Sequence, residues 1–295
     1  MKRPLTIIVT PTSDPLDKRA RTLSPAPPSC PRPLQSPQPI SLVLPFLCVG
    51  SELVSAAQLA SHGVSHVIDC RNTQEQLARG PLPKFPNASN DKLELLSLPL
   101  RDNHAENASK YFYCAIHFIE MARRCGGVVL VHCTRGISRS CALVCAYLIW
   151  YNQIGYRDCL AQLRLSRPEA NPNVSFSLQL VEFAQQRERN VIAFEVSLDG
   201  CGITELSGYQ SALTLINSHS GVLLVVNKLE QKQYLWHDGG EDMQHAAKRA
   251  VETLAQLHVQ PVCVQAFIGT SSSTDLQALF PSPIDSLRRP RNVLL

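Results

Sequence analysis

The sequence predicts an α/β protein with a mostly parallel central sheet flanked by helices, followed by a second, smaller α/β domain. Three observations lead to this fold class. Residues 128–131 are four consecutive apolar residues, a pattern typical of a strand buried on both faces. A helical pattern that starts at Ser109 leads directly into that strand and predicts a βαβ-like unit. Farther along, strands at 222–226 and 233–236 come before a helix and a strand at 262–267.

The elements of the first folded domain follow one another from about Ile40. In order, we expect a strand entering a turn at 41–50, a helix with its C-cap at Gly63, a strand at 64–70, a polar surface excursion at 71–92, a strand at 93–98, a helix from Ser109 to Gly126, the buried strand at 128–131, a helix at 141–151 and a short helix carrying Leu160 and Leu163.

Length and composition fit two folded domains. The chain has 295 residues, of which 44% are hydrophobic, and no run approaches the roughly 18 apolar residues of a membrane span. The first residues lack the apolar stretch of a signal peptide. Eleven cysteines without paired short spacings argue against a disulfide framework or a zinc site. We therefore expect a cytoplasmic or nuclear protein with no metal and no cofactor.

The net charge of +4 is confined to the N-terminal segment. Residues 1–39 carry six Lys and Arg against two Asp, and the rest of the chain is balanced. A balanced folded body favours no nucleic-acid partner.

One stretch carries the chemistry. Cys133 follows the buried strand, and a Gly-containing loop of five residues leads to Arg139 and a helix. Backbone N–H groups of such a loop and the helix dipole point at one place and form an anion trap. The positive potential of these groups lowers the pKa of a thiol from about 8.5 toward neutrality. The planar guanidinium of an arginine can bind two phosphate oxygens at once. This is the chemistry of a cysteine-dependent phosphatase; the alternative is a buried core cysteine.

His132 to Ser140, His-Cys-Thr-Arg-Gly-Ile-Ser-Arg-Ser, resembles the phosphate loop of protein tyrosine phosphatases, above all of the dual-specificity branch. The resemblance implies that Cys133 attacks phosphorus and forms a thiophosphate, and that Arg139 stabilises the transition state. It implies that the Ser140 hydroxyl helps the thiolate leave and that His132 orients Cys133. The phosphate-binding residues would be Thr134, Arg135, Gly136, Ile137, Ser138 and Arg139.

Asp102 is the candidate general acid. It lies 31 residues before Cys133, in Leu-Pro-Leu-Arg-Asp-Asn-His, where the general-acid loop of the same family falls. The resemblance implies that Asp102 protonates the leaving oxygen and later activates water as a base. The alternative is an ordinary loop or capping Asp.

The resemblance covers residues 40–188 and implies the dual-specificity phosphatase fold. Its later part is Arg167-Pro168, followed by Pro172-Asn173 and a Phe-x-x-Gln-Leu run.

Arg135 is basic where this branch often has a small residue. A basic residue would favour a more anionic substrate; the alternative is an exposed residue at the rim of the pocket. Cys70 stands where some relatives carry a cysteine that pairs reversibly with the nucleophile; the alternative is a buried inert thiol.

The proline-rich segment 1–39 is expected to be disordered. Lys2 and Arg3 precede Leu5 and Ile7, which resembles a MAP-kinase docking peptide, whose bases meet an acidic groove. A solvated tail with a chance match is the alternative.

Residues 191–281 are similar to a gelsolin-like module in their order of hairpin, helix and strand, with a C-terminal tail at 282–295. Plant and protist MAP-kinase phosphatases carry such a module. Because Val222, rather than an Asp, follows Gly221, we expect no strong calcium site. The alternative is a small α/β interaction domain.

These features predict a metal-free protein phosphatase acting on phosphotyrosine and phosphoserine or phosphothreonine, with a phosphorylated MAP kinase as the favoured substrate. Two alternatives stay open: a phosphoinositide or RNA 5′-phosphatase with the same mechanism, and a catalytically weak phosphoprotein-binding scaffold.

Overall fold

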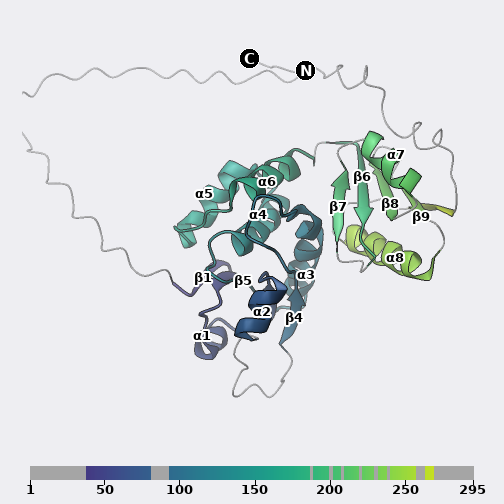
Figure 1. Cartoon of the computed structure of the whole chain (residues 1–295). Coiled ribbons are helices and arrows are strands. Elements are labelled where there is room, and N and C mark those ends of the chain that lie inside the picture. The colour runs from purple at the N-terminus through teal and green to yellow at the C-terminus, as the bar shows by residue number, and fades with distance from the viewer. Residues whose placement is uncertain are drawn as a thin grey trace, which may run out of the picture. The chain divides into compact units, whose positions relative to one another are not determined.

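Two sheets, each of five strands in the part of the chain that the structure describes, form the framework of the protein. Figure 1 shows strands of both sheets. The computed structural model describes residues 38–80, 93–186, 189–198, 202–206, 209–218, 221–228, 232–237, 240–256 and 263–268. The expected docking residues Lys2, Arg3, Leu5 and Ile7 and the C-terminal tail lie outside these ranges.

The first sheet has the strand order β1-β2-β5-β3-β4. Its strands are β1 (Ile40–Leu44), β2 (Leu47–Ser51), β3 (Val64–Asp69), β4 (Glu94–Ser97) and β5 (Val128–Cys133). Only β1 is antiparallel to its neighbour, so the expected mostly parallel sheet is confirmed. The strand β5, which leads to the candidate nucleophile, lies at the centre of this sheet.

The strand entering a turn that we expected at 41–50 is present as β1, but the turn is followed by a second strand, β2, that we did not expect. A turn at Pro45 and Phe46 divides this segment into β1 and β2, which pair with each other. The physical reason is Pro45, which has no N–H to donate to a neighbouring strand and so interrupts the ladder.

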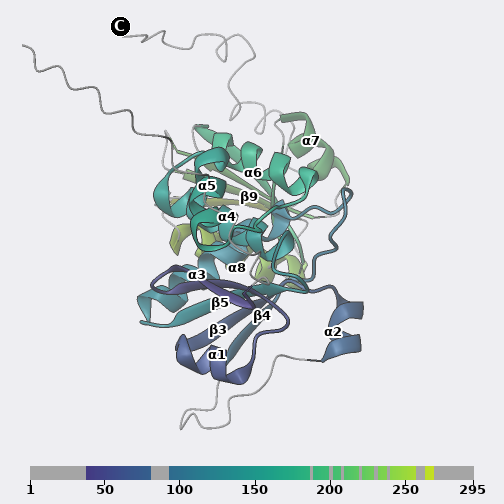
Figure 2. The ribbon, with the colours of Figure 1, turned by 90° about the vertical axis from the view of Figure 1, so that its left-hand side faces the viewer.

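Helices cover both faces of this sheet. The helices of this domain are α1 (Ala56–Ser61), α2 (Thr73–Arg79), the short 3₁₀ helix η1 (Ser109–Tyr111), α3 (Phe112–Arg124), α4 (Arg139–Asn152), α5 (Tyr156–Ser166) and α6 (Val174–Gln186). Figure 2 shows α1 on one face and α4, α5 and α6 on the other. The core follows this division: Leu130 packs with Leu59 of α1, while Val129 and Val131 belong to the larger cluster with α3, α4 and α6.

Helix α2 lies within the segment 71–92 that we expected to be a polar surface excursion. None of its residues is buried, but Asn72 and Glu75 form a capping box: each side chain accepts a hydrogen bond from the other's backbone N–H. The Asn-x-x-Glu spacing is a known start signal for a helix. The helix matters because it places Glu75 next to the candidate site.

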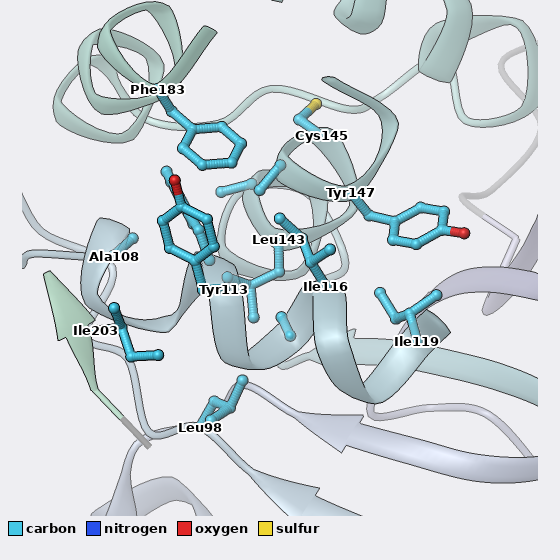
Figure 3. Packing of buried hydrophobic residues seen from close by; sticks show 14 of the residues in the cluster. Leu98, Ala108, Tyr113, Ile116, Ile119, Leu143, Cys145, Tyr147, Phe183 and Ile203 are labelled. Atoms are coloured by element: carbon cyan, nitrogen blue, oxygen red, sulfur yellow. The ribbon is translucent and has the colours of Figure 1, made fainter. Parts of the chain in front are cut away.

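Helix α4 is the buried axis of the first domain. All residues from Arg139 to Ile149 are buried, as expected for a helix that is apolar on every side. Side chains of α3, including Tyr113 and Ile116, lie in one cluster with Leu143 and Tyr147 of α4 (Figure 3). This packing fixes the N-terminus of α4, where the candidate site begins.

The second sheet has the order β10-β9-β8-β6-β7. Its elements are β6 (Val191–Val196), β7 (Ile203–Leu206), α7 (Tyr209–Ser218), β8 (Val222–Asn227), β9 (Lys232–His237), α8 (Glu241–Gln256) and β10 (Cys263–Ile268). Strands β9 and β10 are parallel and the other neighbours antiparallel. The strands and helix predicted from residue 222 onward are present; β6, β7 and α7 were not predicted.

The core of the first domain continues into the second sheet. The centroid of the Tyr113 ring lies 5.5 Å from that of Phe183 in α6 and 5.3 Å from that of Phe194 in β6.

Among the residues that the structure describes, no helix has the length and apolar character needed to cross a membrane.

Candidate active site

The candidate nucleophile lies between the end of β5 and the start of α4. Cys133 is the last residue of β5 and is only 1% exposed. The backbone N–H of Gly136 donates a hydrogen bond to its Sγ over 3.2 Å, and the Oγ of Ser140 lies 3.3 Å from the same sulfur. A backbone N–H donor, a hydroxyl group and the positive end of a helix therefore converge on one sulfur.

Gly136 adopts a conformation that its neighbours require. Its φ is +69°, and a Cβ there would lie 2.6 Å from the carbonyl oxygen of Gly50 and 2.5 Å from Nη2 of Arg167. A side chain would thus be strained in both backbone and contact. The loop can pass this close to β2 only with glycine at this position.

Arg167 holds the loop from outside. It is fully buried and donates from Nε to the carbonyl of Gly136 and, over 3.4 Å, from Nη2 to that of Arg135. Its Nη1 bonds the carbonyl of Gln38 and the hydroxyl of Ser41. Because an N–H points opposite to the carbonyl of its own peptide, drawing these carbonyls outward turns the loop N–H groups inward.

Asp102 is brought to the loop as expected. Its Oδ1 accepts hydrogen bonds from Oγ of Ser138, 2.7 Å away, and from Nδ2 of Asn173, 2.9 Å away. Its Oδ2 lies 4.0 Å from Nε of Arg139, and the side chain is 40% exposed. Ser138 is the N-cap of α4 but does not cap it through its side chain. Its hydroxyl instead holds the carboxyl of Asp102 beside the loop at 134–139, which is the candidate phosphate cradle.

Arg139 is held by a carboxylate that sequence analysis missed. Both terminal nitrogens of its guanidinium bond the carboxylate of Glu75, and the hydroxyl of Thr134 donates to the same carboxylate over 2.9 Å. Burial opposes the charged form of Arg139, but the contact with Glu75 outweighs it and raises the arginine's pKa. The Asn72 capping box signalled a helix start, but no local pattern links Glu75 to a residue 64 positions away.

His132 lies within the core behind Cys133. It is fully buried, with Nε2 3.6 Å from Oδ1 of Asp69. Burial and the charge of Arg71 lower its pKa to about 4, although Asp69 acts in the opposite direction. The ring is therefore neutral near pH 7. Its proposed role in orienting Cys133 stays a prediction.

The other predicted loop residues take different positions. Arg135 is exposed, whereas Ile137 is half-buried and its carbonyl accepts from the N–H of Asn171 over 2.8 Å. Cys70 is fully buried directly after β3, and its N–H donates to the carbonyl of His132 over 2.8 Å. Burial first, and then the nearby Cys133, raise the pKa of the Cys70 thiol.

Comparisons with known proteins identify the family of the first domain. Residues 46–186 match the family "Dual specificity phosphatase, catalytic domain". Mouse dual specificity protein phosphatase 22 is 33% identical over 146 residues, which cover 49% of this chain and 73% of the relative. Human dual specificity protein phosphatase 15 is 34% identical over 143 residues, covering 48% and 44%. The crystal structure of DUSP15 shares 33% identity and covers 49% of this chain and 86% of that chain, with a TM-score of 0.42.

Proposed function

Since the chain belongs to the dual-specificity phosphatase family and is a phosphatase enzyme, we propose that it hydrolyses phosphotyrosine and phosphoserine or phosphothreonine in proteins through a cysteinyl-phosphate intermediate. One observation carries the mechanism. Sγ of Cys133 accepts a hydrogen bond from the N–H of Gly136, Ser138 of the same loop holds Asp102, and Oδ2 of Asp102 lies 4.0 Å from Nε of Arg139. A nucleophile, an acid and an anion cradle thus meet at one place.

In the first step, Sγ of Cys133 forms a bond to phosphorus while the bond from phosphorus to the substrate oxygen breaks. Asp102 gives its proton to that oxygen, which leaves as an alcohol or phenol. The loop N–H groups and the guanidinium of Arg139 stabilise the charge on the other phosphate oxygens. Asp102 is suited to this role because Ser138 and Asn173 hold its Oδ1, leaving Oδ2 near the cradle.

In the second step, water attacks the cysteinyl phosphate and Asp102, now a carboxylate, accepts a proton from it. The S–P bond breaks and the thiolate is restored with release of phosphate. Ser140 assists because its hydroxyl, 3.3 Å from Sγ, can donate to the sulfur as negative charge returns. The cycle needs no metal.

The test compares the wild type with Cys133→Ser on a doubly phosphorylated MAP kinase and on a phosphoinositide. We expect loss of both phosphates from the kinase, abolished in the variant. Cys125→Ser is the matched control, because Cys125 is an exposed cysteine at the C-cap of α3 and not a residue of the loop. Activity retained by Cys133→Ser would refute the cysteinyl-phosphate mechanism.

We propose a phosphorylated MAP kinase as the protein substrate and a cytoplasmic or nuclear location. The support is the basic and apolar sequence of Lys2, Arg3, Leu5 and Ile7, together with the cysteine usage of the chain. Replacing Lys2 and Arg3 by alanine should raise KM for the kinase and leave turnover of a small aryl phosphate unchanged. Equal KM values in the two proteins would remove the docking peptide from the proposal.

A phosphoinositide substrate is the second candidate and rests on the basic side chain of Arg135, although the exposure of this residue fits the alternative of a residue at the rim of the loop. Its guanidinium would meet additional phosphate groups around the reacting one. Phosphate release from the lipid alone, reduced by Arg135→Ala, would favour this candidate over the protein substrate.

Two finer assignments complete the proposal. We propose that Cys70, next to the strand that ends in Cys133, forms a reversible disulfide with it under peroxide; mass spectrometry without a Cys70–Cys133 peptide would exclude this. We also propose residues 191–281 as a gelsolin-like domain, supported by the hairpin β8–β9, the helix α8 and the parallel strand β10. Calcium titration by calorimetry should show no strong binding, because no Asp follows Gly221.

A further inference from the structure

The guanidinium of Arg139 has two edges that can each grip an anion with two N–H groups. The end-on edge consists of Nη1 and Nη2, and the side-on edge of Nε and Nη2. In the structure the end-on edge is occupied by Glu75: Nη2 lies 3.1 Å from Oε1, and Nη1 bonds Oε2. This carboxylate therefore stands where an approaching phosphate could otherwise bind.

The remaining hydrogens of Arg139 are distributed unevenly. Nη1 also donates to the carbonyl of Leu100 over 3.2 Å, and Nη2 to Oγ1 of Thr134 over 3.0 Å. Nε is buried and has no hydrogen-bond partner in the part of the chain that the structure describes. Phosphate can thus bind at the side-on edge while Glu75 stays in place, with Nη2 exchanging its contact with the Thr134 hydroxyl for one with the phosphate.

Glu75 is itself fixed, unlike a surface ion-pair partner. Its Oε2 accepts from the backbone N–H of Asn72 over 2.9 Å, and its own N–H donates to Oδ1 of Asn72 over 3.0 Å. The chain before Asn72 is anchored, since Arg71 grips both carboxylate oxygens of Asp69. Burial opposes ionisation of Glu75, but its bonds from Arg139, Asn72 and Thr134 prevail and lower its pKa.

We propose that Glu75 is a positioning residue for phosphate recognition: it holds the end-on edge of Arg139 so that Nε and Nη2 face the cradle, and the Thr134 hydroxyl gives up Nη2 when phosphate arrives. The inference rests on the proposed function of the loop. It adds to that function a residue from a different segment of the fold, at the start of α2.

An opposite role would follow if Glu75 competed with phosphate for Arg139. Removing its charge would then tighten the binding of an oxyanion. Under the positioning role, removal frees Arg139 to turn, so that oxyanion binding weakens. The sign of one measured change therefore separates the two roles.

The test is calorimetric titration of the full chain with tungstate, an unreactive oxyanion, in the wild type and in Glu75→Gln. Glutamine keeps the shape of the side chain and the capping box but removes the charge. We expect the dissociation constant to rise about 10-fold, as for loss of a partner that orients a binding group, and kcat/KM for an aryl phosphate to fall by a similar factor. Glu94→Gln is the control, because Glu94 is an exposed carboxylate at the start of β4, the strand next to β3 in the first sheet.

Arg139→Lys shows whether Glu75 acts through Arg139. A lysine has no second edge to orient, so Glu75→Gln should change tungstate affinity less than twofold in that background. An equal loss in both backgrounds, an unchanged affinity in the wild-type background, or tighter binding would each overturn the proposal. Failure of the wild type to turn over phosphoesters, with the expected changes in tungstate binding intact, would refute the proposed function alone. Failure of the wild type to bind tungstate would overturn both.

Discussion

Replacing Gly136 by alanine should damage both stability and catalysis. The new Cβ would sit at a φ of +69°, which costs a non-glycine residue about 1–2 kcal/mol. It would also lie 2.6 Å from the carbonyl oxygen of Gly50. That atom belongs to the backbone of β2 and cannot rotate away, so overpacking adds about 1–3 kcal/mol. We expect a total loss of about 3 kcal/mol in the free energy of unfolding.

The assay has a control within the same protein. Gly126 has a similar φ, +74°, but nothing lies within 4 Å of its Cβ position. Gly126→Ala should therefore cost only the backbone term, about 1 kcal/mol. In thermal unfolding we expect a fall in Tm of roughly 6–12 °C for Gly136→Ala and roughly 2–4 °C for Gly126→Ala.

Catalysis separates the two variants more sharply. The N–H of Gly136 is a donor to the Cys133 sulfur, and a shift of the loop of about 1 Å is enough to lower kcat about 100-fold. Gly126→Ala should retain wild-type kcat. If Gly136→Ala unfolded no earlier than Gly126→Ala and kept its kcat, the close passage of the loop over β2 would be refuted.

Three further predictions concern the residues around the sulfur. Asp102→Asn should lower kcat about 100-fold for substrates with poor leaving groups, because the proton donor is lost; an unchanged rate would assign the acid to another residue. Ser140→Ala should slow hydrolysis of the cysteinyl phosphate about 10-fold, seen as a product burst in rapid-mixing kinetics; without a burst, thiolate departure does not depend on this hydroxyl. For His132, whose folded-state pKa is about 4 against an ordinary 6.5, the unfolded chain binds more protons between these pH values. Its stabilising contribution is complete above pH 6.5 and falls by about 3 kcal/mol as pH drops to 4. His132→Gln should flatten that part of the denaturant-derived stability curve, and an equally steep curve would contradict the burial argument.

Local patterns were enough to predict the elements on either side of the loop. Four apolar residues before Cys133, a glycine within the loop and an apolar run after Arg139 each leave a mark in a short stretch of sequence. The structure places them as a buried strand, a tight turn and a buried helix. Asp102 was found because a loop carboxyl at that distance fits the family, and the structure brings it within 2.7 Å of Ser138.

The supports of the loop could not be predicted in the same way. Arg167 was noticed only as part of a motif, yet its contacts reach back to Gln38 and Ser41, more than 120 positions earlier. Such contacts depend on the order of strands in the sheet, which hydrophobic periodicity does not reveal. The same holds for β6 and β7, because a short strand and a short segment of buried helix give similar apolar runs.

The two missed supports act on opposite sides of the same anion site. Arg167 draws the carbonyls of Arg135 and Gly136 outward, and Glu75 holds the guanidinium of Arg139 on the side away from Nε. Arg167 provides a positive charge to these carbonyl oxygens, and Glu75 provides a negative charge to the guanidinium. Because these dipoles are already oriented before phosphate arrives, little reorganisation is needed as charge develops in the transition state. In the proposed mechanism the loop therefore supplies the nucleophile and the anion site, while Arg167 and Glu75, from other segments of the chain, orient the groups that bind phosphate.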